Sequence, residues 1–221
     1  WGYREIDTLG GHDPYSASKS AVEIICNSYR SSFFSDYINP LTRITLATAR
    51  AGNVIGGGDW QTDRIVPDCI KSIEDDRPII VRNPNSIRPW QHVLEPIYGY
   101  MLLAMHLNIN PLKYASAWNF GPENSNYKTV SKLVNQLISD YGKGSWNESS
   151  KPHNKPETGR LKLDNTKSVS HLGWLPTWGF NTTVRKTVEW YKNYKSSNMF
   201  RLATDQIDNY ISTIENQNPF N

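Results

Sequence analysis

The chain has 221 residues and a mass of 25.3 kDa, enough for one domain of ordinary size or two small ones. Hydrophobic residues make up 38% and charged residues 20%, with eight tryptophans, a composition that excludes a mainly disordered chain and a disulfide-stapled mini-protein. No run reaches the roughly 18 apolar residues of a membrane span, and the mean hydropathy is -0.60. The net charge of +3 predicts neither a nucleic-acid nor a membrane partner.

Two cysteines occur, Cys26 and Cys69, each with apolar neighbours. Neither has the close Cys or His spacing of a metal site. We expect reduced, buried thiols, which suits a cytoplasmic location. The chain opens at Trp1 without a charged and then apolar leader, and we expect a longer protein that has lost its beginning.

The first half predicts helices that alternate with short strands. Asp13 can cap a helix over 15–34, and Pro14 suits the first helical position. The pattern then predicts a buried strand over 43–49, a Gly-rich loop over 50–60, a helix over 65–74, a strand over 79–82 and a helix over 96–107.

The second half continues this alternation. Apolar residues at a period of 3.6 give its strongest helix, over 130–141. The other expected elements are a strand over 117–120, a polar surface loop over 142–160, a strand over 161–163, a helical face over 184–191 and a final helix from Met199.

This order predicts an α/β fold, the remainder of a doubly wound, Rossmann-like parallel sheet. Such a domain normally opens with a strand and a Gly-rich turn that holds a cofactor's phosphates at a helix N-terminus. The sequence contains no Gly-x-Gly-x-x-Gly. We therefore expect the segment that binds a dinucleotide diphosphate to lie outside this chain.

Tyr15 and Lys19 are the first candidates for chemistry. Their i, i+4 spacing puts a phenol and an ammonium on one helix face, and a nearby ammonium stabilises a phenolate that acts as a base. A solvated surface pair is the alternative, since Tyr191 and Lys195 repeat the spacing. The cap and the small residues around Tyr15 favour the functional interpretation, and we interpret the Tyr191 pair as surface.

The Gly-rich loop and three arginines form the second group of candidates. Asn53 follows a buried strand, where ligands of open parallel sheets bind, and it could donate to a phosphate or sugar oxygen. Arg64, Arg82 and Arg88 could grip a diphosphate through forked hydrogen bonds. A flexible connection and surface ion pairs are the alternatives.

His92 and Glu95 stand three residues apart near a helix start. The spacing occurs in metal sites, but no second pair accompanies it, so we predict a hydrogen-bonded structural role and no metal. The sequence also lacks a Gly-x-Ser-x-Gly elbow, a P-loop and a His-Glu-x-x-His motif.

Five segments together resemble a known family, the extended short-chain dehydrogenase/reductases that act on nucleotide sugars, and within it the CDP-glucose 4,6-dehydratases. The resemblance covers most of residues 1–176 and thins after Trp190. The segments are Asp13–Lys19 (DPYSASK), Arg50–Trp60 (RAGNVIGGGDW), Asp63–Pro67 (DRIVP), Ile87–Pro96 (IRPWQHVLEP) and Trp118–Pro122 (WNFGP).

The resemblance implies the conversion of CDP-glucose to its 4-keto-6-deoxy form with NAD as cofactor, on the route to O-antigen dideoxyhexoses. Tyr15 would be the base at the C4 hydroxyl, and both Tyr15 and Lys19 would bind the cofactor, Lys19 at the nicotinamide ribose. The resemblance implies that residues 1–60 belong to the NAD-binding domain. It also implies that residues 61–221 form a smaller C-terminal α/β substrate-binding domain, some elements of which return to the NAD-binding domain. The residues implied to bind substrate are Asn53, Arg64, Val81, Arg82, Arg88 and Arg160.

The same resemblance implies a homodimer that pairs through the long helix beginning at Tyr15. It also implies that the Gly-rich turn and other assisting residues precede Trp1, so we expect the chain alone neither to hold NAD stably nor to turn over CDP-glucose. Two alternatives stay open: a nucleotide-sugar epimerase or reductase of the same fold, and a non-catalytic module that binds nucleotide sugars.

Overall fold

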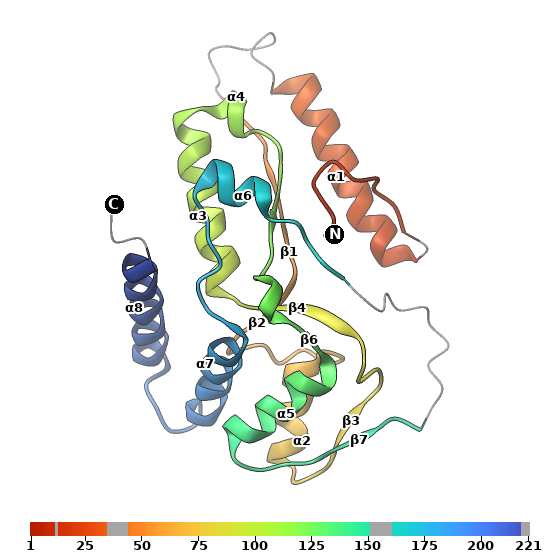
Figure 1. Cartoon of the computed structure of the whole chain (residues 1–221), viewed down its shortest axis with the longest axis vertical. Helices are drawn as coiled ribbons and strands as arrows, with labels where there is room; N and C mark the ends of the chain where they lie inside the picture. The colour runs from red at the N-terminus through yellow and green to blue at the C-terminus, as the bar shows by residue number, and fades with distance from the viewer. Residues whose placement is uncertain (12, 35–43, 151–160, 218–221) are drawn as a thin grey trace. The chain divides into compact units, whose positions relative to one another are not determined.

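The computed structural model describes residues 1–11, 13–34, 44–150 and 161–217 and shows an α/β protein with parallel strand pairs (Figure 1). The chain forms two compact units, each assembled from three segments. Unit 1 comprises Trp1–Ala51, Pro96–Gly121 and Leu163–Leu175, and unit 2 comprises Gly52–Glu95, Pro122–Lys162 and Pro176–Asn221. No helix in the described part of the chain is long and apolar enough to cross a membrane.

Unit 1 contains a two-stranded parallel sheet in which Thr48 pairs with Ala117 and Ala51 with Phe120. Its strands are β1 (Thr48–Ala51) and β5 (Ala117–Phe120), and its helices are α1 (Pro14–Phe33), α3 (Leu94–Ile109, from Pro96 onward), α4 (Pro111–Tyr114) and α6 (Thr166–Leu172).

Helix α1 begins where the sequence predicts it. The Asp13 carboxylate accepts from the backbone amides of Tyr15 at 2.9 Å and Ser16 at 3.0 Å. The side-chain hydrogen bond from Ser16 and these amide bonds hold the pKa of Asp13 below its usual value, because they stabilise its charged form. None of the residues of α1 is buried.

The core of unit 1 forms where helix α3 meets strand β5. A Cβ at Gly99 of α3 would lie 2.4 Å from the Phe120 ring, so glycine permits this close approach. Trp174 meets the same Phe120 ring edge-to-face, at 5.1 Å between centroids. Trp118 donates from Nε1 to the Tyr114 carbonyl at 2.9 Å, which satisfies the buried indole.

Unit 2 contains a three-stranded sheet in the order β2-β4-β6 and a parallel pair of β3 with β7. Strands β2 and β4 run parallel, whereas β4 and β6 run antiparallel. The elements of unit 2 are β2 (Asn53–Ile55), α2 (Ile65–Glu74), β3 (Ile79–Val81), β4 (Ile87–His92), the 3-10 turn η1 (Asn124–Asn126), β6 (Tyr127–Thr129), α5 (Val130–Tyr141), β7 (Trp146–Glu148), α7 (Phe180–Asn193) and α8 (Met199–Gln217).

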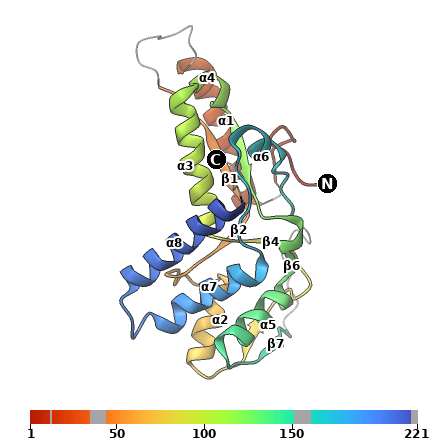
Figure 2. The same ribbon diagram turned by 60° about the vertical axis from the view of Figure 1, so that its left-hand side comes forward.

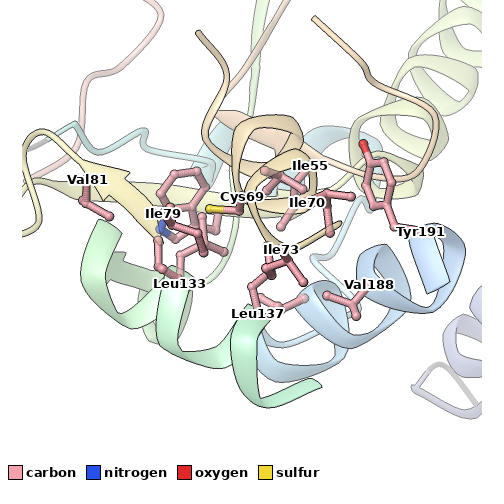
Figure 3. Close-up of a cluster of buried hydrophobic side chains, with 14 of the residues drawn as sticks. Ile55, Cys69, Ile70, Ile73, Ile79, Val81, Leu133, Leu137, Val188 and Tyr191 are labelled. Carbon is pink, nitrogen blue, oxygen red and sulfur yellow. The ribbon is translucent and has the colours of Figure 1, made fainter. Parts of the chain in front are cut away.

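The core of unit 2 gathers side chains from α2, α5, α7 and the strands (Figure 3). Ile70 of α2 and Leu133 of α5 are completely buried, and Val188 of α7 is 1% exposed. Each helix turns one apolar stripe inward, as its 3.6-residue period requires. Removing these side chains from water supplies the main stabilising term of the unit.

Helix α8 follows α7 through a short connection and packs beside it (Figure 2). Gln206 of α8 donates to the Lys186 carbonyl at 2.9 Å. Tyr210 donates to the Glu95 carboxylate at 2.8 Å. These two bonds satisfy polar groups that packing of the helix buries.

Several expected elements are confirmed, and some are wrong. Helices α2 and α5 and strand β5 have the predicted bounds, α1 and α3 lie within a few residues of theirs, and a last helix begins at Met199. The strand predicted over 161–163 is wrong, because Leu163 makes only an isolated bridge with Tyr3. The loops predicted over 50–60 and 142–160 include strands β2 and β7, the strand predicted over 43–49 begins only at Thr48 and runs to Ala51 as β1, and strands β4 and β6 were not predicted. The domain division at residue 60 stays a prediction.

Candidate functional site

Tyr15 and Lys19 lie in the first two turns of α1, in unit 1. The Lys19 Nζ atom is 5.6 Å from the centroid of the Tyr15 ring. Tyr15 is 72% exposed, so a ligand can reach its hydroxyl. The predicted pairing of a phenol with an ammonium on one helix face is present, and the catalytic role of the pair stays a prediction.

Glu23 ties the helix that carries Tyr15 to strand β1. Its carboxylate accepts from Arg50 Nε at 2.9 Å and Nη2 at 3.0 Å, and from the Thr48 hydroxyl at 2.8 Å. Burial acts to raise the pKa of Glu23, but hydrogen bonds from Arg50 and Thr48 outweigh it and hold the pKa below its usual value. Sequence reasoning missed Glu23, for which the only signal is a single acid in the middle of the helix.

Asn53 and Arg88 lie on adjacent strands of the sheet in unit 2. Asn53 opens β2 and pairs with Trp90 of β4, and Arg88 lies two residues before Trp90. Because side chains alternate along a strand, all three point to one face of the sheet. Arg88 is 9% exposed and donates from Nη1 to the Ile87 carbonyl at 3.0 Å.

The other two arginines are each held by a carboxylate of one loop, residues 56–64. Arg64 Nη1 is 3.6 Å from Asp59 Oδ2, and Arg82 pairs with the Asp63 carboxylate. Both guanidinium groups are more than half exposed, so an anionic ligand can reach them. Sequence reasoning missed the roles of Asp59 and Asp63, whose signal was their proximity to Arg64 in the same loop.

Val81 and Arg160 complete the predicted substrate set. Val81 is 1% exposed in the core of unit 2 (Figure 3), and its carbonyl accepts from the Ser149 amide at 2.8 Å. Its nucleotide contact stays a prediction. Arg160 lies outside the described residues.

His92 and Glu95 have the hydrogen-bonded structural role that was predicted because no second His–Glu pair accompanies them. The Glu95 carboxylate accepts from the Trp178 amide at 2.6 Å and the Thr177 amide at 3.0 Å. Burial raises the pKa of Glu95, and Nδ1 of His92 accepts from the Leu94 amide at 3.3 Å. Across the described ranges, no group of three His, Cys, Asp or Glu side chains could hold a metal ion.

The interpretation of Tyr191 as a surface residue is wrong. Tyr191 is 1% exposed, and its hydroxyl donates to the Asp59 carbonyl at 2.6 Å. Burial raises the pKa of Tyr191 to about 12. Lys195 pairs with Glu74 at 3.2 Å. The surface interpretation failed because the partners of both residues lie more than a hundred residues earlier in the sequence.

Comparison with solved structures identifies the fold class of this chain. A dTDP-glucose 4,6-dehydratase from Streptomyces venezuelae, solved with NAD and TYD bound, matches with a TM-score of 0.72 at 18% identity, over 88% of this chain and 56% of that one. A Thermotoga maritima UDP-glucose 4-epimerase, solved with UDP-glucose, gives a TM-score of 0.70 at 18% identity, over 89% of this chain and 59% of that one. The protein therefore has the Rossmann-like α/β fold, as the element order predicted.

The profile of the NAD dependent epimerase/dehydratase family matches residues 4–114, and the chain belongs to this family. It is 42% identical over 216 residues to CDP-glucose 4,6-dehydratase of Salmonella typhimurium, which covers 96% of this chain and 59% of that protein. It is 23% identical over 199 residues to dTDP-glucose 4,6-dehydratase of the same organism, over 86% of this chain and 50% of that one. The chain thus spans between half and three fifths of these relatives.

Proposed function

We propose that the chain is the larger part of an NAD-dependent CDP-glucose 4,6-dehydratase, a lyase that forms CDP-4-keto-6-deoxyglucose. The observation that carries this proposal is the 42% identity to the Salmonella CDP-glucose 4,6-dehydratase over 96% of the chain. Identity to the dTDP-glucose 4,6-dehydratase of the same organism is 23%. This difference favours CDP-glucose over dTDP-glucose as the substrate.

In the proposed reaction the substrate loses one water across C5 and C6, after oxidation at C4. NAD, when bound, accepts the hydride from C4 and supplies it to C6. The Lys19 ammonium stabilises the phenolate form of Tyr15, and this phenolate accepts the proton of the C4 hydroxyl to become a neutral phenol. The exposed phenol and the ammonium 5.6 Å from its ring fit this role, because both can contact a nicotinamide ribose and a sugar.

In unit 2 we assign the nucleotide diphosphate to Arg64, Arg82 and Arg88, with Asn53 donating to neighbouring oxygens. Guanidinium groups bind phosphate oxygens in pairs. Val81 and Arg160 complete the assignment as residues near the nucleotide. Calorimetric titration of the chain with CDP, against UDP and dTDP, tests it, and we expect preferential binding of CDP.

A chimaera tests the enzymatic function. The chimaera joins this chain to the part of the Salmonella CDP-glucose 4,6-dehydratase that the chain does not match. We expect the chimaera to convert CDP-glucose to a product lighter by one water, as measured by mass spectrometry. We expect the Tyr15→Phe variant to lose at least about a hundredfold in kcat while CDP affinity is kept, and Tyr29→Phe on the same helix is the control.

The two alternatives give different outcomes in this assay. An epimerase of the same fold would give a product of unchanged mass. A non-catalytic module would bind CDP with no turnover, and Tyr15→Phe would change nothing. Turnover by the 221-residue chain without the added segment would contradict our expectation that the chain alone neither holds NAD nor acts on CDP-glucose.

We also propose a cytoplasmic homodimer that pairs through α1, in the synthesis of O-antigen dideoxyhexoses. Val22, Ile25 and Phe33 of α1 are each more than half exposed, and burying such a stripe against a second copy would stabilise a dimer. Sedimentation of the chimaera and of its Ile25→Glu variant tests the pairing. A dimer that persists in Ile25→Glu would contradict pairing through this face.

A further inference from the structure

The second Tyr-x-x-x-Lys pair of the sequence, on α7, contacts the loop that carries Arg64. Tyr191 donates to the Asp59 carbonyl in the middle of that loop. Figure 3 shows the Tyr191 ring at the edge of the buried cluster, with its hydroxyl oxygen turned away from Val188. The core thus fixes the ring, while the hydroxyl is available to a backbone group of the loop.

Aromatic packing holds the same loop against α7. The Trp60 ring meets Tyr191 edge-to-face at 5.2 Å between centroids, and it meets Tyr194 at a tilt of 58° and 4.9 Å between centroids. A Cβ at Gly57 would lie 2.0 Å from the Trp190 ring, so only glycine lets the loop approach so closely. Lys71 donates to the Trp60 carbonyl at 2.7 Å and adds a contact from α2.

Asp59 joins this scaffold to the candidate phosphate ligand. Its carbonyl oxygen accepts from Tyr191, and its carboxylate Oδ2 lies 3.6 Å from Arg64 Nη1. One residue therefore connects a buried hydroxyl to an exposed guanidinium group. Arg64 precedes the first residue of α2, so the path of the loop determines where its guanidinium group lies.

We propose that Tyr191 is a positioning residue for nucleotide binding, which fixes through Asp59 the loop that presents Arg64 to the diphosphate of a nucleoside diphosphate. This inference rests on the proposed function, because it presumes that Arg64 binds the substrate's diphosphate. Tyr191 itself does not touch the ligand. It restricts the positions that the guanidinium group adopts before the ligand binds, which lowers the entropy lost on binding.

The test is a double-mutant cycle on the 221-residue chain, with CDP as the probe in calorimetric titration. Tyr191→Phe removes the hydroxyl and keeps the ring. Tyr194→Phe is the matched control, because its hydroxyl donates to the Glu74 carboxylate at 3.0 Å instead of the loop. Arg64→Gln, alone and with Tyr191→Phe, closes the cycle. Circular dichroism sets a temperature at which every variant is folded.

We expect Tyr191→Phe to raise the Kd for CDP about fivefold, the value of one hydrogen bond, and Tyr194→Phe to leave it within about twofold. In the Arg64→Gln background, Tyr191→Phe should add no further loss. An unchanged Kd in Tyr191→Phe, an equal loss in Tyr194→Phe, or additive losses with Arg64→Gln would each overturn the positioning role. Absence of CDP binding by the unmodified chain would instead refute the assignment of the diphosphate to Arg64, on which this inference rests, whereas turnover by the chimaera tests the enzymatic function separately.

Discussion

Protonation of the buried His92 should destabilise the protein in acid. His92 is 2% exposed, and its Nδ1 accepts from the Leu94 amide, so the neutral ring carries its proton on Nε2. That atom has no hydrogen-bond partner in the described residues. Its ring meets Trp178 edge-to-face at 4.9 Å. A second proton would create a cation in apolar surroundings.

Burial, together with the nearby Lys186 ammonium, lowers the pKa of His92 from 6.5 to about 4. Between these values the unfolded chain binds more protons than the folded one. The stabilising contribution is therefore complete above about pH 6.5 and is lost as the pH falls through the folded pKa. A shift of about 2.5 units corresponds to roughly 3 kcal/mol of unfolding free energy at full loss.

Urea unfolding of the wild type and of His92→Gln, at about pH 7 and pH 4, measures this loss. The raised pKa of Glu95 acts with the opposite sign, because stability from a carboxyl with a raised pKa is lost as the pH rises. Only the difference between the two proteins therefore isolates His92. We expect the unfolding free energy of the wild type, relative to that of His92→Gln, to fall by about 3 kcal/mol between about pH 7 and pH 4. If the difference in unfolding free energy between wild type and His92→Gln does not depend on pH, the reasoning is refuted. His171→Gln, at an exposed position, controls for the effect of a His-to-Gln substitution itself.

Three further predictions concern a buried side chain, the two cysteines and the carboxylate of Asp63. Ile70→Ala, at a fully buried position, should lower the unfolding free energy by about 2–5 kcal/mol, measured from the urea midpoint with Ile80→Ala as the exposed control. The prediction of two buried thiols is confirmed for Cys69 and wrong for Cys26, which is half-buried. A thiol reagent should modify Cys26 in the folded protein and reach Cys69 only after denaturation, because Cys69 is fully buried and burial raises its pKa to about 12. Asp63→Asn should tighten CDP binding in calorimetry, since Asp63 competes with phosphate for a guanidinium group; asparagine tolerates the positive φ of 61° at this position.

The sequence predicted the elements whose causes are local. Asp13 and Pro14 mark the start of α1 because a cap and a fixed φ act within one turn. The 3.6-residue period of α5 follows from the single face that the helix buries. Tyr15 and Lys19 share a face for the same geometric reason. Each of these features needs only a few neighbouring residues, so one sequence suffices to predict it.

Strand β4 escaped prediction because its partners are distant. Arg88, Gln91 and His92 are polar and yet buried, and pairing with β2 and β6 places them there. The sequence pattern predicted no element there, because a pattern counts residue types and does not show which polar groups find partners. The burial of Tyr191 has the same explanation, since its hydroxyl donates to Asp59, 132 residues earlier.

The division into two units also explains which substitutions make informative tests. The chain passes from one unit to the other within three of the five segments that carry the family resemblance, at Ala51–Gly52, Glu95–Pro96 and Gly121–Pro122. A substitution at one of these junctions can affect both units, so a loss of binding there would not identify which unit it acts through. Tyr15, Asp63 and Tyr191 each lie well inside one unit. A loss of binding or turnover at these positions can therefore be assigned to one unit.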